Sequence, residues 1–451
     1  MIRSSFKKMN FKLLLVIFLT LLIPVIYRTT RIFFIGTTPD VWGFSIAGNL
    51  EWINVIFEVV EEMFLLPLFF SLRKIIKLKD IEDRNKKISW QIFLIMTIYI
   101  IMITFMIIFT RQLMNFMSVG LITEEAINFV RIEFLTRIFV VGVKLGAIFL
   151  IAKNLWKELI ASLFLETIIN ILMDLFIVSD NSLSLQKGIL WIGYDQLITS
   201  SFIFVVLLIF VYKKYDFSFS HTIPRVHFDR KSWNQHLYIG LESFIRNAFF
   251  IWFVIKTIDK LGSGYSEGDF WVMNSFIWDW LLLPIMALSQ YLNRSQALDH
   301  DKKFSLKDRL IAPFILVGIS VVIWIALIPT YDPFIRVVMN DEDHKLISHL
   351  AIISIGFYVV MAFNEPIDKV MIGDGKAQYI LLQSIIVNII VFIPYYYASK
   401  TMTISDVAIM MGTSIAVDSL ITFAMFFVWI KSKKNTKNKN KYLNLFSRTK
   451  K

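Results

Sequence analysis

The sequence contains no cysteine, so the chain has no disulfide framework, no thiolate nucleophile and no sulfur ligand for a metal. Only six histidines are present, all in or beside predicted loops, and no two stand at metal-ligand spacing on a helix. A glycine-rich phosphate loop, a Walker motif and a serine elbow are also missing. We therefore expect neither an enzyme nor an ATP-driven pump, and we expect no cofactor and no resident metal.

Proline and charge are scarce as well. The 451 residues include ten prolines and 18% charged side chains, against 56% hydrophobic residues and a mean hydropathy of +0.63. A soluble domain of this length is less apolar. The first apolar stretch runs past Pro24 without a small-residue cleavage site, so we expect no cleavable signal peptide. The composition indicates an all-α polytopic membrane protein.

A sliding window of about 20 residues predicts roughly twelve membrane-spanning helices. They lie near 11–34, 50–72, 89–110, 125–152, 157–179, 187–212, 233–257, 269–292, 309–330, 346–372, 377–397 and 405–430. With six helices each, the two halves are parallel repeats about an axis along the membrane normal, with a cleft where they meet. We predict an N-terminal six-helix bundle at 1–212, a joint at 213–232, a C-terminal six-helix bundle at 233–430 and a basic tail at 431–451.

Two carboxylates at a common offset support this internal repeat. Glu62 and Asp279 each lie inside an apolar run five residues before a proline, and they are 217 positions apart. At the same offset, Glu166 aligns with Gln383 within two similar aliphatic segments. A charged side chain at bilayer depth costs about 2.5–3.5 kcal/mol on insertion scales, so it normally marks a site or a pathway. The repeat favours a transporter with ionisable groups in its cleft.

The net charge of +12 would indicate a nucleic-acid partner in a soluble protein, but here its distribution indicates a membrane topology. About 34 basic residues fall on the side of the termini and the joint, against about five on the opposite side. We therefore expect no nucleic-acid partner and a protein of the cell (plasma) membrane with both termini and the joint in the cytoplasm. We interpret the Lys-rich tail as a tether to anionic lipid of the bilayer.

Charged stripes on two helices of the first half predict ion pairs between those helices. The second predicted helix carries Glu51, Glu58 and Glu62 on one face, and the fourth carries Glu133, Arg137 and Lys144 on one face. Such pairs either neutralise each other and fix the helices or contribute to a site, and the sequence leaves both readings open.

The seventh and tenth helices carry the remaining candidates. Glu242 and Arg246 stand one turn apart and are placed to pair within their own helix. The apolar stretch Leu350–Phe363 is only about 21 Å long at 1.5 Å per residue, so the following residues must also lie at membrane depth or line water. This places Glu365 and Asp368 toward a cavity, where Asp368 is either a coupling carboxylate or an interfacial structural one.

Three segments resemble a known family. Gly-Leu-Glu-Ser-Phe-Ile-Arg-Asn (240–247), Phe-Trp-Val-Met-Asn-Ser-Phe-Ile-Trp-Asp-Trp-Leu-Leu-Leu-Pro (270–284) and Ile-Asp-Lys-Val-Met-Ile-Gly-Asp-Gly-Lys-Ala-Gln-Tyr (367–379) look like a bacterial branch of the multidrug and toxic compound extrusion (MATE) family. This family lies within the wider multidrug/oligosaccharidyl-lipid/polysaccharide exporter superfamily. The resemblance implies two six-helix bundles in a V shape that exchange Na⁺ or H⁺ for organic cations. The acidic positions that match the family's coupling residues are Glu242 and Asp368, where Na⁺ would bind. Some members use an aspartate in the first helix, but this chain has Arg28 and Arg31 there and no carboxylate.

We therefore expect a monomeric secondary active transporter that exports organic cations by alternating access. We assign cation coupling to Glu242, Asp368 and Glu365, and contact with substrate in the cleft to Glu62, Asp279, Glu58, Glu166 and Gln383. The alternative is a flippase for a lipid-linked oligosaccharide, whose cavity is typically cationic. Roughly eleven acidic side chains against six basic ones in the predicted spans favour cation export over that alternative. A membrane assembly factor without transport activity is a more distant possibility.

Overall fold

A computed structural model describes most of the chain. The described residues are 2–37, 54–65, 78–117, 123–179, 182–188, 190–215, 230–255, 264–298, 306–373, 377–398 and 402–448, with a few single positions between them. Several predictions concern residues outside these ranges: Glu51, Pro67, and most of the joint at 213–232. The side chains of the tail beyond residue 431 are likewise outside the described set.

Helices account for nearly all of the described residues, and none of these residues forms a strand. The first half contains α1 (Ile2–Lys8), α2 (Phe11–Thr37), a helical segment at 54–65, α4 (Ile81–Ile108), α5 (Thr110–Met117), α6 (Glu124–Ala152), α7 (Trp156–Met173) with the π-helical turn η1 (Asp174–Val178), and α8 (Leu190–Tyr215).

The second half repeats this pattern of long helices. It contains α9 (Arg230–Phe249) with η2 (Phe250–Ile255), α11 (Gly264–Ser275) with η3 (Phe276–Leu281), α12 (Leu283–Leu298), α13 (Leu306–Leu327) with η4 (Ile328–Thr330), α14 (Tyr331–Val338), α15 (His344–Gly373), α16 (Ala377–Val387) with η5 (Asn388–Phe392), α17 (Ile393–Ala398) and α18 (Ile404–Arg448).

Ten of the described helices are long and apolar enough to cross a membrane. An eleventh span is formed by Gly268–Leu281 and Leu283–Asn293, which meet at a bend of 56° next to Pro284. The helical segment 54–65 lies within the remaining predicted span, 50–72. The prediction of an all-α polytopic membrane fold is confirmed, and every predicted span contains described helical residues.

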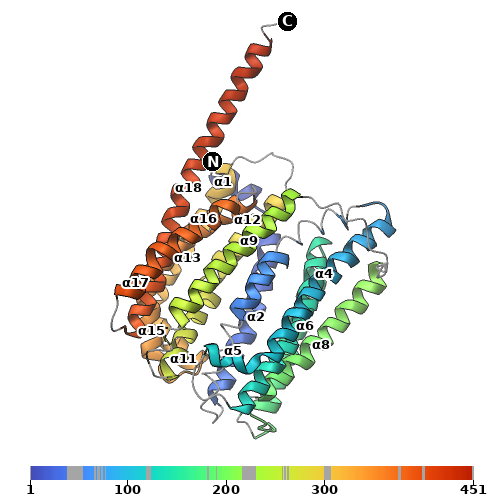
Figure 1. Cartoon of the computed structure of the whole chain (residues 1–451), viewed down its shortest axis with the longest axis vertical. Helices are drawn as coiled ribbons and strands as arrows, with labels where there is room; N and C mark the ends of the chain where they lie inside the picture. The colour runs from blue at the N-terminus through green and yellow to red at the C-terminus, as the bar shows by residue number, and fades with distance from the viewer. Residues whose placement is uncertain are drawn as a thin grey trace.

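Each half has an apolar core, and Trp271 of α11 also packs into the core of the first half. One core is built from α4, α6 and the segment 54–65, with Tyr99 and Phe134 fully buried. The other is built from α11, α13, α15 and their neighbours, with Phe270 and Tyr331 buried. Figure 1 shows α4, α5, α6 and α8 on one side, α9 to α18 on the other, and α2 between them.

The helix α2 packs against both halves. Its residues Leu13 and Ile17 share a small core with Ala287 and Tyr291 of α12, and the backbone N–H of Asn10 donates to the Tyr291 hydroxyl at 3.0 Å. On its other side α2 packs along α7. The helix α2 is therefore the main structural link between the halves near its N-terminal end.

Small residues allow the closest helix approaches within each half. A Cβ atom at Gly412 of α18 would lie 2.2 Å from the Phe357 ring of α15, and one at Gly142 of α6 would lie 2.4 Å from the Phe204 ring of α8. Helices in a membrane associate largely through such close packing, because lipid is as apolar as the side chains it would replace. These glycines therefore set the spacing of the two most extensive helix pairs.

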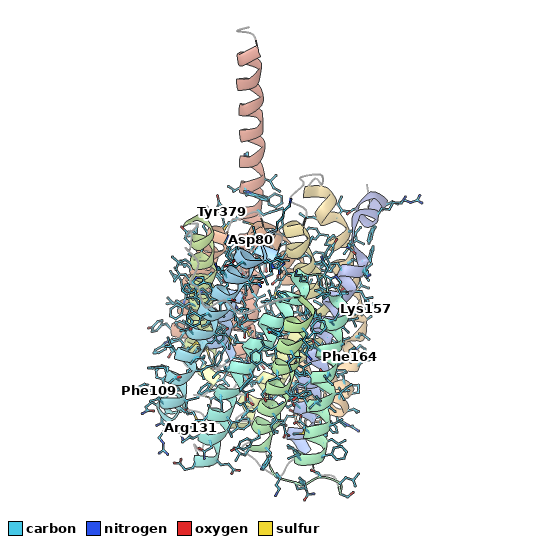
Figure 2. All side chains as sticks on the ribbon, turned by 90° about the vertical axis from the view of Figure 1, so that its right-hand side faces the viewer. Asp80, Phe109, Arg131, Lys157, Phe164 and Tyr379 are labelled. Atoms are coloured by element: carbon cyan, nitrogen blue, oxygen red, sulfur yellow. The ribbon has the colours of Figure 1, made fainter. Side chains whose placement is uncertain are left out.

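The two chain ends lie at the same end of the bundle, where α18 continues well beyond the other helices (Figure 1). Asp80, which caps the start of α4 by accepting from the backbone N–H of Glu82 at 2.9 Å, lies toward that end. Figure 2 places Arg131 toward the opposite end, and the exposed ring of Phe164 between them on the outer surface. The apolar outer surface between the two ends is suited to lipid contact.

Candidate functional site

A cluster of charged residues joins the two halves through Arg246 of α9. Its guanidinium contacts Glu62 at 2.9 Å and Glu58 at 3.5 Å, both from the helical segment 54–65 of the first half. It also contacts Glu242 of its own helix at 3.2 Å. The predicted pairing within α9 is present, but Arg246 additionally binds two carboxylates that the sequence analysis assigned to the cleft.

The segment 54–65 presents two neighbouring faces to different partners. Glu58 and Glu62 are four residues apart and face α9, whereas Glu61 binds Lys144 of α6. The expected ion pairing between the second and fourth helices therefore uses Glu61 rather than the stripe of Glu58 and Glu62. The reason is geometric: adjacent residues of a helix point about 100° apart, so Glu61 and Glu62 face different neighbours.

Arg137 of α6 has a neutral partner instead of a carboxylate. It donates to the side-chain oxygen of Asn54 and lies over the Phe57 ring, 5.3 Å from its centroid. Glu133, on the same face of α6, binds Arg31 of α2 at 2.9 Å. The predicted charged face of α6 thus divides its contacts between two helices of the first half.

A second ion pair joins the halves through α2. Arg28 contacts Asp279 at 2.6 Å, and the side chain of Asp279 is only 11% exposed. Beside this pair, the indole N–H of Trp280 donates to the Thr29 hydroxyl at 3.0 Å. Asp279 lies within the π-helical turn η3, whose extra residue widens the helix ahead of the bend at Pro284.

Within the second half, polar side chains gather around Asp368 of α15. Asn364 donates to one carboxylate oxygen of Asp368 at 2.8 Å, and the other oxygen is buried and has no hydrogen-bond partner. Glu365 pairs with Lys369 at 3.6 Å. Asp418 of α18 interacts with Asp368, and buried Gln383 of α16 hydrogen-bonds Asp418. The structure therefore places Gln383 among the proposed coupling residues.

The first half contains a cluster that the sequence analysis missed. Asp174 of η1 and Asp195 of α8 are fully buried, and neither carboxylate has a hydrogen-bond partner on either oxygen. Both interact electrostatically with Arg31, which also binds Glu133 and the side-chain oxygen of Gln196. Both aspartates lie inside predicted spans, so the same rule that identified Glu62, the cost of a charge at membrane depth, was sufficient to find them.

Two further observations bear on the chemistry of these clusters. Glu166 of α7, partly buried, lies within interacting range of Lys144, beside the Glu61 pair. Among the residues that the structure describes, no three His, Asp or Glu side chains are grouped so that they could hold a metal ion.

Comparisons with known proteins identify the fold. No protein-family model matches the sequence, and no curated protein does. An outward-facing multidrug resistance MATE family transporter of the MOP superfamily superposes with a TM-score of 0.70 at 14% identity, covering 94% of this chain and 95% of that chain. An inward-facing MATE family transporter superposes with a TM-score of 0.69 at 15% identity, covering 91% and 95%.

A third similar structure is a MOP superfamily transporter from Pyrococcus furiosus Vc1 (DSM3638), for which a binding pocket of reverse polarity suggests a different function. It superposes with a TM-score of 0.67 at 16% identity, covering 94% of this chain and 95% of that chain. The chain therefore has the fold of the MATE transporters. The resemblance noted in the sequence is confirmed at the level of fold.

Proposed function

We propose that the protein is a secondary active transporter, and not an enzyme, that exports organic cations in exchange for Na⁺ or H⁺. One observation carries this proposal: each half contains a cluster in which three carboxylates outnumber the bases beside them. In the first half Glu133, Asp174 and Asp195 interact with Arg31. In the second half Glu365 and Asp368 interact with Lys369, while Asp418 interacts with Asp368 and with Arg246.

The excess of carboxylates supports coupling to a cation. Ionised carboxylates without a counter-charge are unfavourable at membrane depth, and binding a proton or a sodium ion removes that penalty. Asp174, Asp195 and one oxygen of Asp368 have no hydrogen-bond partner, so they can accept such an ion without breaking an existing bond. We propose Asp195 and Asp368 as the coupling carboxylates of the two halves, with Glu242 next to the interface.

A reconstituted transport assay tests this function. Purified protein in proteoliposomes is given an imposed Na⁺ or H⁺ gradient, and the efflux of a panel of organic cations, including a quaternary ammonium dye, is followed. We expect gradient-driven efflux in the parent and at least a tenfold loss in Asp195→Asn and Asp368→Asn. Asp83→Asn, at a half-exposed carboxylate in the first turn of α4, is the control and retains parent efflux. The absence of efflux with every cation under either gradient would contradict the proposal.

The alternative function is a flippase for a polyprenyl-linked glycan, and one observation favours it. At the interface between the halves, Arg28 and Arg246 have side chains that are 53% and 43% exposed, and Lys144, within the first half, is 41% exposed. Most of their carboxylate partners are less exposed, for instance Asp279 at 11%. If a pyrophosphate-linked lipid displaces a lipophilic cation dye from the parent protein, and no gradient drives dye efflux, the flippase function replaces cation export.

We also propose that the protein is located in the plasma membrane, as a monomer, with both termini in the cytoplasm. The location of both chain ends at one end of the bundle supports a common side for them (Figure 1). The excess of Lys and Arg in the segments on that side supports the cytoplasm as the side.

A further inference from the structure

Two arginines connect the halves in equivalent ways. Arg28 comes from α2, the first span of the first half, and binds Asp279 in the second span of the second half at 2.6 Å. Arg246 comes from α9, the first span of the second half, and binds Glu62 in the second helix of the first half at 2.9 Å. Each half therefore contributes one arginine and one carboxylate to the interface.

The repeat in the sequence relates these two pairs to each other. Glu62 and Asp279 are 217 positions apart, and Arg28 and Arg246 are 218 positions apart. Exchange of the two halves thus converts one ion pair into the other. A pair of contacts related in this way is expected where two equivalent halves meet along an approximate two-fold axis.

The residue after each arginine also bonds across the interface. Thr29 accepts a hydrogen bond from the indole N–H of Trp280 at 3.0 Å. Asn247 donates from its side-chain amide to the backbone carbonyl of Val55 at 3.3 Å. Trp280 directly follows Asp279, whereas Val55 lies seven residues before Glu62, so the two bonds are not equivalent, but each adds a second contact across the interface.

The two arginines lie at different positions along their spans. Arg28 is the eighteenth of the 24 residues of the span Phe11–Phe34, whereas Arg246 is the tenth of the 18 residues of the span Leu237–Val254. Both helices begin at the end of the bundle that carries the chain termini (Figure 1). Arg246 therefore lies near the middle of its span, and Arg28 lies nearer the end that is away from the termini.

The contacts are also suited to breaking and re-forming. Arg246 keeps Glu242 of its own helix as a partner at 3.2 Å when the halves separate. The Arg28 side chain is already 53% exposed, so water can replace Asp279 around it. Separation of the halves leaves neither guanidinium buried without a counter-charge, which is the usual penalty for breaking a buried ion pair.

We propose that Arg28 and Arg246 form a two-part latch that holds the halves together. The latch opens when the cleft, at first accessible from one side of the membrane, becomes accessible from the other. This latch goes beyond the proposed function. It concerns the movement of the two halves, and it does not depend on which solute or ion the protein carries.

Disulfide formation between the halves measures this latch directly. A Cβ atom at Gly240 would lie 2.8 Å from the Met63 Cβ, so Met63→Cys with Gly240→Cys places two thiols close enough to bond after a small shift. The chain has no other cysteine. Oxidation by copper phenanthroline in native membranes gives a cross-linking rate that reports how long the interface stays closed, and the readout requires no transport.

We expect Arg246→Gln to slow cross-linking at least fivefold and Arg28→Gln to slow it at least threefold. The Arg28 ion pair joins a different pair of helices from the pair that carries the reporter cysteines. An effect of Arg28→Gln on the cross-linking rate therefore shows that the halves move together. The swapped variant Arg28→Asp with Asp279→Arg restores the rate to within twofold of the parent. Arg111→Gln, which removes an exposed ion pair within the first half, leaves the rate unchanged.

Three results would overturn the proposal. Rates within twofold of the parent in both arginine variants, in protein that elutes as a single species in size-exclusion chromatography, would exclude a latch. An effect of Arg246→Gln without one of Arg28→Gln would exclude a two-part latch. Slow cross-linking in the swapped variant would exclude charge pairing as the cause. A failure of cation transport with all cross-linking results as expected would contradict the proposed function and leave the latch intact.

Discussion

Replacement of Arg31 by methionine tests whether the buried cluster of the first half is held together by its single base. Arg31 contacts Glu133 at 2.9 Å, and the two side chains are 16% and 3% exposed. It also interacts with Asp174 and the hydroxyl of Tyr27. Methionine keeps most of the apolar stem of the side chain and removes the charge, so the change is mainly electrostatic.

The size of the effect follows from the geometry. With an effective dielectric constant near 20, two charges 2.9 Å apart attract by about 6 kcal/mol. The desolvation of both ions offsets part of this attraction, and removal of one partner from a buried pair typically costs about 3–5 kcal/mol. We expect Arg31→Met to lower the free energy of unfolding by an amount in that range.

A double-mutant cycle separates the ion pair from other effects of the substitution. Equilibrium unfolding by dodecyl sulfate in mixed micelles is followed through the fluorescence of the chain's 12 tryptophans. We expect Glu133→Gln added to Arg31→Met to recover stability, with a coupling energy of about 1–3 kcal/mol. Arg111→Met breaks an ion pair whose side chains are 56% and 72% exposed, and as a control it changes stability by less than about 1 kcal/mol. The reasoning is refuted if Arg31→Met lies within about 1 kcal/mol of the parent, or if the double variant is no more stable than the single one.

Three further predictions concern packing, topology and substrate charge. Gly412→Ala places a Cβ atom 2.2 Å from the Phe357 ring, so we expect a loss of about 1–2 kcal/mol in unfolding free energy, since overpacking exceeds the gain in helix propensity. Ser218→Cys in the predicted joint is labelled by an impermeant maleimide only after the cells are opened, because we predict that the joint is cytoplasmic. Glu62→Gln weakens the binding of a quaternary ammonium dye about 5- to 30-fold, whereas Glu61→Gln, which faces α6, leaves it within twofold.

Each of these predictions has an outcome that contradicts it. Gly318→Ala, where an added Cβ meets nothing within 4 Å, serves as the packing control. A loss of stability there equal to that of Gly412→Ala would show that the Phe357 contact is not the cause. Labelling of residue 218 in intact cells would reverse the topology. Equal weakening of dye binding by the two glutamate variants would show that the interface side of the helix is not the one that faces the substrate.

The sequence was sufficient to predict the spans because each is a long apolar run between polar segments. Pro284, five residues after Asp279, also indicated the position of the bend in the eighth span. The ion-pair partners of the charged side chains were not predictable. The sequence showed that Glu58 and Glu62 share a face, but helical periodicity does not state which helix lies opposite that face. The structure places α9 there, and α6 opposite Glu61.

Asp174, Asp195 and Asp418 show a second limit. Each is a carboxylate inside a predicted span, and each was passed over because no local pattern, such as the spacing of Glu62 to its proline, drew attention to it. Their importance depends on contacts made by residues far apart in the chain: Asp174 and Asp195 are 21 positions apart and both interact with Arg31 of α2. A count of every charge at membrane depth would have found all three, but not their grouping.

The positions of the charged clusters suggest how ion binding and movement of the halves are connected. The proposed ion-binding carboxylates lie inside each half, whereas the paired arginines lie between the halves. Lys369 is the residue that belongs to both regions, because it pairs with Glu365 at 3.6 Å and also interacts with Glu62 and Arg246 at the interface. Binding of a cation by Glu365 or Asp368 reduces the attraction that holds Lys369 near them. We propose that the same event leaves Lys369 freer to compete with Arg246 for Glu62, so that an ion bound inside the second half changes which of its bases pairs with the first half.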